Sequence, residues 1–235
     1  MEWNRTIRGD SLEEMKKLPD NLFDTIITSP PYNKGYWSRN RNVNNGFKTK
    51  SRRIEYENFD DKMKPEDYNK FHSECITEML RLLKPTGSLF YNHTDILRDH
   101  QTHFPSFILD FPLKQIIVWN RKNTPKLDKS YFFPTTEWIF WLQKDKKART
   151  YFHRKKADFA TNVWNIPPDR KNKHPAPFPI ELPLNAIKAT TPPDGIVFDP
   201  FMGSGTTAKA AEQLNRKWLG IDLSPNYKEK TNEET

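Results

Sequence analysis

The sequence has few of the residues on which disulfide-rich, zinc-binding or membrane-spanning proteins depend. Cys75 is the one cysteine among 235 residues, which excludes an internal disulfide and a thiolate zinc cluster. No run approaches the roughly 18 apolar residues of a membrane span, and the amino terminus lacks the apolar core of a secretory signal. We therefore expect no membrane partner and a cytoplasmic location.

Acidic residues are also in the minority. The chain has 30 aspartates and glutamates against 38 lysines and arginines, which gives a formal net charge of +8 at pH 7. A positive field of this kind suits a polyanion such as nucleic acid. The charge alone does not distinguish a nucleic-acid partner from an unspecialised basic surface.

Periodicity predicts one α/β domain over residues 1–235. Helices are expected at 11–18, 65–83, 180–189 and 206–214. Strands rich in aromatic and β-branched residues are expected at 24–28, 87–92, 114–120, 136–142, 195–199 and 217–222. Strands that alternate with helices indicate a mainly parallel sheet with right-handed crossovers and helices on both faces, a Rossmann-like fold. A long basic loop is expected at 33–58, and residues 144–173 are charged and irregular apart from the segment VWNIPP.

A glycine-rich turn runs from Asp199 to Thr207 between a predicted strand and a predicted helix. Glycines there let the backbone approach a ligand, and Asp222 follows at the distance from which a carboxylate accepts ribose hydroxyls. The pattern Gly203-x-Gly205-x-x-Ala208 also satisfies the dinucleotide fingerprint, so a nicotinamide oxidoreductase remains an alternative. Asp199 favours a cationic or ammonium-bearing ligand, because it would repel a pyrophosphate.

A second turn, Thr28 to Asn33, reads Thr-Ser-Pro-Pro-Tyr-Asn and follows a buried strand. Its strand is expected beside the strand of the glycine turn, so both turns open at one sheet edge. The prolines make the turn stiff and supply carbonyls without competing donors, which suits an NH2 group, and Tyr32 offers a flat face to a base.

Together the two turns resemble the catalytic and cofactor motifs of amino-group DNA methyltransferases of the beta group, in which the motif order is circularly permuted. The resemblance covers nearly the whole chain. It implies S-adenosylmethionine as cofactor, DNA as partner and a restriction-modification context; a cognate restriction endonuclease and a homodimer are left open. It assigns catalysis to Ser29, Pro30, Pro31 and Tyr32, and it requires no metal.

By the same resemblance Asp199 binds the methionine ammonium, Asp222 holds the ribose and Asp10 accepts from the adenine amino group. The full set of implied cofactor residues is Asp10, Phe178, Pro179, Asp199, Pro200, Phe201, Gly203, Ser204, Gly205, Thr206, Thr207 and Asp222.

Ser29 stands where adenine enzymes usually have aspartate, so the chain is most similar to the N4-cytosine subgroup. N6-adenine is the runner-up, followed by an RNA amino-methyltransferase and a non-catalytic DNA-binding module. The target-recognition insertion is expected at about 144–173 and is short. The basic loop is therefore expected to share in binding DNA through Lys34, Tyr36, Trp37, Arg39, Arg41, Lys48, Lys50, Arg52 and Arg53.

The remaining chemistry-bearing residues are predicted to be structural. Cys75 and His72 lie on the apolar stripe of the helix that begins at Pro65, and His93 follows a strand. Neither histidine has metal-ligand spacing with another candidate. Because the cysteine lies in the core, a cytosine-C5 mechanism with a thiolate nucleophile is not expected.

Overall fold

An eight-stranded sheet forms the centre of the computed structural model, which describes residues 1–33, 36, 62–98, 101–122, 132–159, 161–168 and 179–223. In order across the sheet the strands are β1 (Arg5–Arg8), β10 (Lys217–Asp222), β9 (Ile196–Asp199), β2 (Phe23–Thr28), β3 (Leu83–His93), β7 (Thr136–Gln143), β6 (Leu113–Asn120) and β8 (Val163–Asn165). Neighbours from β1 to β3 pair in parallel, whereas β7 is antiparallel to both β3 and β6. The β6–β8 pair is parallel again.

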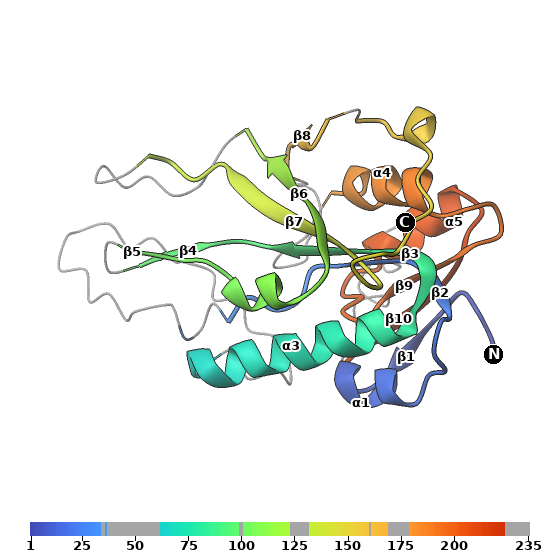
Figure 1. Cartoon of the computed structure of the whole chain (residues 1–235), viewed down its shortest axis with the longest axis horizontal. Coiled ribbons are helices and arrows are strands. Elements are labelled where there is room, and N and C mark those ends of the chain that lie inside the picture. Colours follow the sequence, from blue (N-terminus) through green and yellow to red (C-terminus); the bar gives the residue numbers. More distant parts are fainter. Residues whose placement is uncertain are drawn as a thin grey trace, which may run out of the picture.

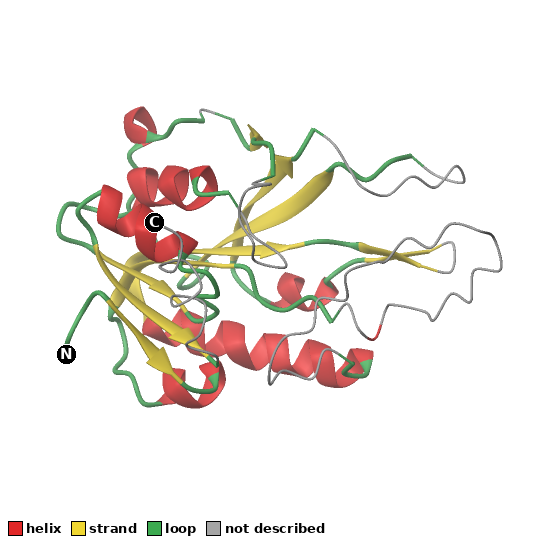
Figure 2. Cartoon of the chain, turned by 180° about the vertical axis from the view of Figure 1, so that it is seen from behind, coloured by secondary structure: helices red, strands yellow, loops and turns green. Residues whose placement is uncertain are grey.

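Helices cover both faces of this sheet (Figures 1 and 2). One face carries α1 (Ser11–Lys16) and the long α3 (Pro65–Leu82), and the other carries α4 (Glu181–Thr190) and α5 (Thr206–Gln213). Short elements complete the described chain: the antiparallel pair β4 (Ile96–Arg98) and β5 (Gln101–His103), and the 3-10 helices η1 (Ser106–Asp110) and η2 (Arg154–Lys156).

Local sequence explains where the main helices begin. Asp10 caps α1, because its Oδ1 accepts hydrogen bonds from the backbone N–H groups of Leu12 and Glu13, each at 3.0 Å. Pro65 opens α3, where a missing N–H has no consequence, and acidic residues follow in its first turn. Gly205 precedes α5 in a left-handed conformation.

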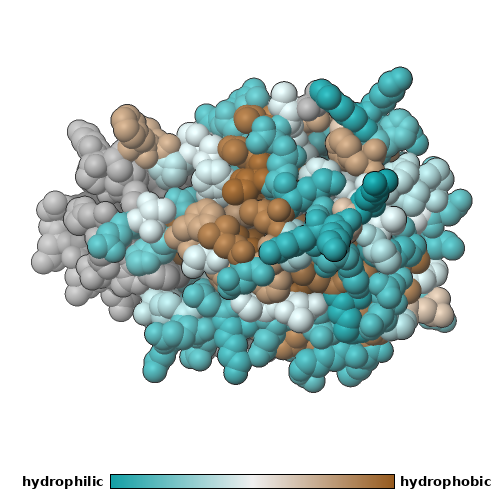
Figure 3. Space-filling view, viewed as in Figure 1, coloured by the Kyte–Doolittle hydropathy of each residue, from teal (hydrophilic) through white to brown (hydrophobic). Residues whose placement is uncertain are grey.

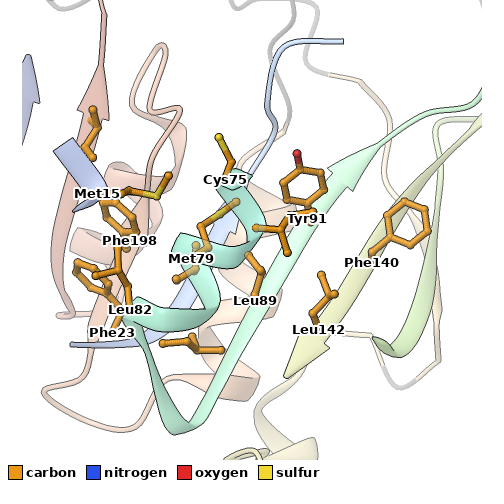
Figure 4. Packing of buried hydrophobic residues seen from close by; sticks show 14 of the residues in the cluster. Met15, Phe23, Cys75, Met79, Leu82, Leu89, Tyr91, Phe140, Leu142 and Phe198 are labelled. Atoms are coloured by element: carbon orange, nitrogen blue, oxygen red, sulfur yellow. The ribbon is translucent and has the colours of Figure 1, made fainter. Parts of the chain in front are cut away.

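Alternating side chains divide the buried residues into two layers. Along the central strands, Ile26, Leu89 and Phe198 join the cluster under α1 and α3, whereas Ile27 and Phe90 join the cluster under α4 and α5. This period of two is what a strand buried on both faces requires. Figure 4 shows the first cluster from close by, with side chains of α3 packed against strand side chains.

The surface matches this layering. In Figure 3 polar side chains cover most of the visible face, including the edge where α3 runs in Figure 1, and apolar side chains gather near the middle. In the part of the chain that the structure describes, no helix combines the length and apolar character needed to cross a membrane.

The residues predicted to be structural lie in the core. Cys75 is fully buried on α3, and burial raises the pKa of its thiol, which makes a thiolate nucleophile unfavourable. His72 is also fully buried, where desolvation holds its pKa well below the usual range, and its Nδ1 is hydrogen-bonded to the hydroxyl of Tyr91.

The predicted α/β fold is confirmed, with three additions that sequence patterns did not predict. Strand β1 has four residues and lies at one end of the sheet. The β4–β5 pair was not expected, and β8 lies in the VWNIPP part of the segment 144–173, where no strand was predicted. That segment joins the sheet because β8 pairs with β6 and Trp164 is buried in the second cluster.

Candidate active site

The two predicted turns meet at the carboxyl edge of the sheet. Strands β2 and β9 are parallel neighbours, with Ile26 opposite Phe198, so both chains leave the sheet at the same edge. A direct hydrogen bond joins the turns, because Thr28 Oγ1 donates to Asp199 Oδ1 at 2.7 Å. Any ligand bound by the glycine turn therefore lies next to the Ser-Pro-Pro-Tyr turn.

Asp199 is a buried brace at this junction. Its Oδ1 also accepts from the backbone N–H of Phe201 at 3.0 Å, and its Oδ2 accepts from Thr207 Oγ1 at 2.6 Å. The side chain is fully buried, and burial raises its pKa from 3.8 to about 6, although the hydrogen bonds from Thr207 and Thr28 act in the opposite direction. The carboxylate thus holds the start of α5 and the end of β2 in addition to its predicted contact with an ammonium group.

The glycine turn has the backbone that its sequence predicts. Gly203 and Gly205 have φ angles of 51° and 78°, in the left-handed region that glycine adopts most readily. The N–H of Gly203 donates to Asp222 Oδ2 at 2.7 Å, which ties the turn to the end of β10. A Cβ added to Gly205 would meet nothing within 4 Å, so there is open space beside the turn. A nucleoside cofactor fits this combination of free space, flexible backbone and a nearby carboxylate.

The end of β1 completes this side of the site. The N–H of Gly9 donates to the Asp222 carbonyl at 3.1 Å, and Ser11 Oγ donates to the Pro200 carbonyl at 2.5 Å. These bonds bring Asp10, the predicted adenine contact, to the same edge as Asp222. Asp10 uses Oδ1 to cap α1, so Oδ2 is the oxygen placed for the adenine amino group.

The other predicted cofactor residues fall into three groups. Ser204 and Thr206 lie in the turn, with their hydroxyl oxygens 3.3 Å apart. Phe201 is partly buried, and its ring meets Phe71 of α3 edge-on. Pro179 is buried at the start of α4, where its carbonyl accepts from Leu182 N, so the structure places it in the packing of that helix. Phe178 lies outside the described residues.

The Ser-Pro-Pro-Tyr turn is held by a polar cluster that we call the Glu137 cluster: Ser29, Tyr32, Asn92, Arg121 and Glu137. Ser29 Oγ and Tyr32 Oη are 2.9 Å apart. Asn92 Nδ2 donates to Tyr32 Oη at 2.6 Å and to Glu137 Oε2 at 3.1 Å. Glu137 Oε1 accepts from Arg121 Nη1 at 2.8 Å. The predicted catalytic serine therefore lies at one end of a charged hydrogen-bond network.

Helix α3 supports the other side of the same turn. Tyr68 Oη donates to the Pro31 carbonyl at 3.1 Å and is 2.7 Å from His93 Nε2. Asn33 Nδ2 donates to the Met63 carbonyl at 2.7 Å. The Pro31 carbonyl thus already accepts one hydrogen bond, and the catalytic role of Pro30 stays a prediction.

Tyr32, which is predicted to offer a flat face to a base, is buried. Its side chain is 5% exposed, and its ring lies 5.0 Å from the ring of His93. The reason is its hydroxyl, which the Glu137 cluster draws inward. A base could stack on this ring only after the side chain or its surroundings rearrange.

The predicted DNA-contacting residues lie outside the described residues, except for Tyr36. Tyr36 is 36% exposed and lines a cavity of about 480 Å³. Tyr68, His93, Phe104 and Phe107 line the same cavity, which therefore backs onto the Ser-Pro-Pro-Tyr turn through Tyr68 and His93. The cavity volume is in the range of ligand pockets.

Sequence reasoning missed the supporting residues Tyr68, Asn92, Arg121 and Glu137. Asn92 ends the strand motif Gly87–Asn92, so the rule that side chains at carboxyl ends of strands gather at one edge could have identified it. Arg121 follows β6 in the same way. Glu137 begins β7, and only the antiparallel direction of that strand brings it to this edge.

This edge has the arrangement of a methyltransferase site, with a nucleoside-binding glycine turn beside a stiff proline turn. Residues 23–233 match the family model of the N6/N4 DNA methylases, whose description is DNA methylase. Because that match covers most of the sequence, the chain belongs to this family. The family is S-adenosylmethionine-dependent, so the cofactor is S-adenosylmethionine and not a nicotinamide.

Individual relatives agree with the family match. The chain is 29% identical over 260 residues to the Type II methyltransferase M.BglII of Bacillus subtilis. This match covers 95% of the chain and 66% of that protein. It thus spans slightly less than two thirds of this relative's length.

Two solved structures show the same fold. The PvuII DNA methyltransferase (cytosine-N4-specific) has a TM-score of 0.72 at 23% identity, over 94% of this chain and 82% of that chain. TTHA0409 from Thermus thermophilus, complexed with S-adenosyl-L-methionine, has a TM-score of 0.69 at 24% identity, over 97% of this chain and 91% of that chain. The fold is therefore that of the S-adenosylmethionine-dependent methyltransferases.

Proposed function

We propose that the chain transfers a methyl group from S-adenosylmethionine to the exocyclic N4 of a flipped-out cytosine in DNA, in a restriction-modification context. The observation that carries the choice of base is Ser29 in the Ser-Pro-Pro-Tyr turn, where adenine enzymes of the resembled group usually have aspartate. N6-adenine is the alternative, because the family includes both kinds of enzyme.

The side chains support a reaction without a covalent intermediate. A cytosine amino nitrogen shares its lone pair with the ring, so it is a weak nucleophile until its hydrogens are held out of that conjugation. Ser29 Oγ and the Pro30 carbonyl are the acceptors proposed to hold them. Two preorganised acceptors also stabilise the positive charge that grows on nitrogen during transfer.

When bound, S-adenosylmethionine supplies an electrophilic methyl group on its sulfonium. The residues proposed to hold it are Asp199 for the methionine ammonium, Asp222 for the ribose and Asp10 for the adenine. Gly203 and Gly205 are proposed to let the backbone of the turn approach it closely. The Thr28–Asp199 hydrogen bond fixes the distance between these groups and Ser29. Positioning of the methyl group against the amino nitrogen then supplies much of the acceleration.

The direct test is nucleoside mass spectrometry of DNA and RNA after incubation with the protein and S-adenosylmethionine. We expect N4-methylcytosine in DNA, and much less of it when Ser29→Ala replaces the wild type in a matched incubation. N6-methyladenine with unmodified cytosine would overturn the choice of base. A methylated RNA with unmodified DNA would overturn the substrate, and no methyl transfer would support a non-catalytic DNA-binding module.

DNA binding is proposed to involve the basic loop at 33–58 and the segment at about 144–173 as parts of one catalytic domain. Neutralising Lys48, Lys50, Arg52 and Arg53 together should weaken binding to all sequences and flatten its salt dependence. Each lost phosphate contact removes about 0.9 from the slope of log affinity against log salt concentration. An unchanged slope in a fluorescence titration would show that these four residues do not contact DNA phosphates and that the loop is an ordinary solvated surface.

A further inference from the structure

The Glu137 cluster contains a carboxylate that the proposed chemistry does not use. This carboxylate belongs to Glu137, whose side chain is 12% exposed and forms an ion pair with Arg121 at 2.8 Å. Its second oxygen faces the site, where it accepts from Asn92 Nδ2 at 3.1 Å and from Tyr32 Oη at 3.5 Å. The hydroxyl of Tyr32 thus links Glu137 to Ser29.

Donor and acceptor types fix one of these hydrogen bonds and leave another open. An ionised carboxylate only accepts, and an amide NH2 only donates. Tyr32 Oη therefore accepts from Asn92, and its own proton can go either to Glu137 Oε2 at 3.5 Å or to Ser29 Oγ at 2.9 Å. When the carboxylate takes that proton, Ser29 is the donor of the Ser29–Tyr32 bond.

We propose that Glu137 is a positioning residue that makes Ser29 a hydrogen-bond acceptor toward the target amino group. With its proton directed to Tyr32, Ser29 accepts a long 3.4 Å contact from Asn92 Nδ2 and keeps a lone pair for an incoming N–H group. If Tyr32 instead donated to Ser29, one of those lone pairs would be occupied. This inference rests on the proposed function and adds a residue from β7 to that site.

The orientation of Asn92 supports this role. Its side chain is buried, and its Oδ1 has no hydrogen-bond partner among the described residues. Burying an unpaired acceptor is unfavourable, so the amide keeps this orientation because the two hydrogens of its nitrogen are shared among three oxygens on the other side. Those oxygens belong to Tyr32, Glu137 and, at 3.4 Å, Ser29. Glu137 is the charged member of the three and the strongest acceptor.

The test compares Glu137→Gln with a matched ion-pair variant, Glu78→Gln. Glu78 pairs with Arg81 at 2.8 Å on α3, with side-chain exposures of 19% and 27%. A glutamine at 137 presents an NH2 donor as well as an acceptor, so it no longer directs the Tyr32 proton. We expect kcat to fall about 10- to 100-fold, the range typical when the partner that orients a functional side chain is removed. Cofactor affinity and the KM for DNA should change little, and Glu78→Gln should leave kcat unchanged.

The decisive comparison places Glu137→Gln in a Ser29→Ala background. If Glu137 acts through Ser29, the double variant has the same kcat as Ser29→Ala alone. If the factors by which the two single substitutions lower kcat multiply in the double variant, the inference is overturned. A wild-type kcat in Glu137→Gln would also overturn it. Should Glu137→Gln fail to fold, Tyr32→Phe removes the intervening hydroxyl and should lower kcat by a similar factor; a wild-type kcat there would also overturn it. The proposed function fails separately, if the wild type itself methylates neither base.

Discussion

The two turns at the carboxyl edge are held in place in different ways. The glycine turn is braced from nearby in the sequence, as in the bond between Thr207 and Asp199, eight residues apart. The Ser-Pro-Pro-Tyr turn depends on side chains from distant strands, such as Glu137, 105 residues from Tyr32. The cofactor side thus combines local contacts with the long-range bonds Thr28–Asp199 and Ser11–Pro200, whereas the target side depends mainly on long-range polar contacts. Single substitutions should therefore affect the two sides differently.

The largest effect is expected on the cofactor side, from Asp199→Ala. It leaves Thr28 Oγ1, Thr207 Oγ1 and the N–H of Phe201 without their shared acceptor in a buried position, and each lost partner costs about 1 to 3 kcal/mol. The free energy of unfolding and S-adenosylmethionine binding should both fall, as measured by denaturant titration and calorimetry.

Asp199→Asn separates these two roles. Asparagine keeps the shape and can still pair with both threonine hydroxyls, so stability should stay near that of the wild type. The charge-assisted bond to an ammonium is lost, which is worth roughly 1.5 to 3 kcal/mol, or about 10- to 150-fold in affinity. Unchanged affinity in Asp199→Asn would remove the ammonium contact from the proposal.

On the target side, Ser29→Ala should lower turnover by about 10²- to 10³-fold, as does removal of one preorganised hydrogen-bonding group in other active sites. Cofactor affinity should stay close to normal, because Ser29 is part of the other turn. A kinetic assay with labelled cofactor checks the turnover, and calorimetry checks the affinity. A large loss of affinity would show that the two sides are not separable in this way.

The pH dependence should be intermediate in size and limited to the cofactor side. Burial raises the pKa of Asp199 from 3.8 to about 6, so the folded state binds this proton more tightly than the unfolded state. The contribution of Asp199 to the free energy of unfolding therefore falls as pH rises between those two values. The ionised form binds the ammonium, so cofactor affinity should rise over the same window, by up to about tenfold per pH unit. Calorimetry over this pH range should show the trend in the wild type and not in Asp199→Asn.

The smallest effect is expected from Tyr68→Phe. This change removes the hydrogen bond to the Pro31 carbonyl and the one with His93 Nε2, each worth about 0.5 to 1.5 kcal/mol, and leaves the ring in place. Turnover should fall a few-fold with no change in cofactor affinity. A loss as large as that of Ser29→Ala would mean that α3 contributes more to the turn than these two bonds.

The same contrast explains how much the sequence could predict. Gly203, Gly205 and Asp199 lie in one short motif whose geometry follows from local residue preferences, so their arrangement was predictable. The main strands and helices were predictable too, because their periodicity is strong. Strand β1 was not, since four residues with partial burial carry almost no pattern.

The Glu137 cluster could not be predicted from local patterns. Residues 136–142 read as an ordinary buried strand, and nothing in them shows the direction in which it runs. Only the antiparallel pairing of β7 with β3 brings its first residues to the carboxyl edge. The hydrogen bonds of the buried Tyr32 involve the same contact, so its burial could not be predicted from the local sequence either.

The position of these residues on separate strands has a consequence for redesign. The proposed cofactor groups belong to β9, β10 and the end of β1, whereas the residues around Ser29 belong to β3, β6 and β7. Variation on the second set can alter the acceptor pattern presented to a base while the first set keeps its affinity for the methyl donor. A library restricted to Asn92, Arg121 and Glu137, selected on DNA with altered bases, is therefore a compact route to new target preferences. The Thr28–Asp199 bond links the two turns directly, so both residues should stay fixed in such a library.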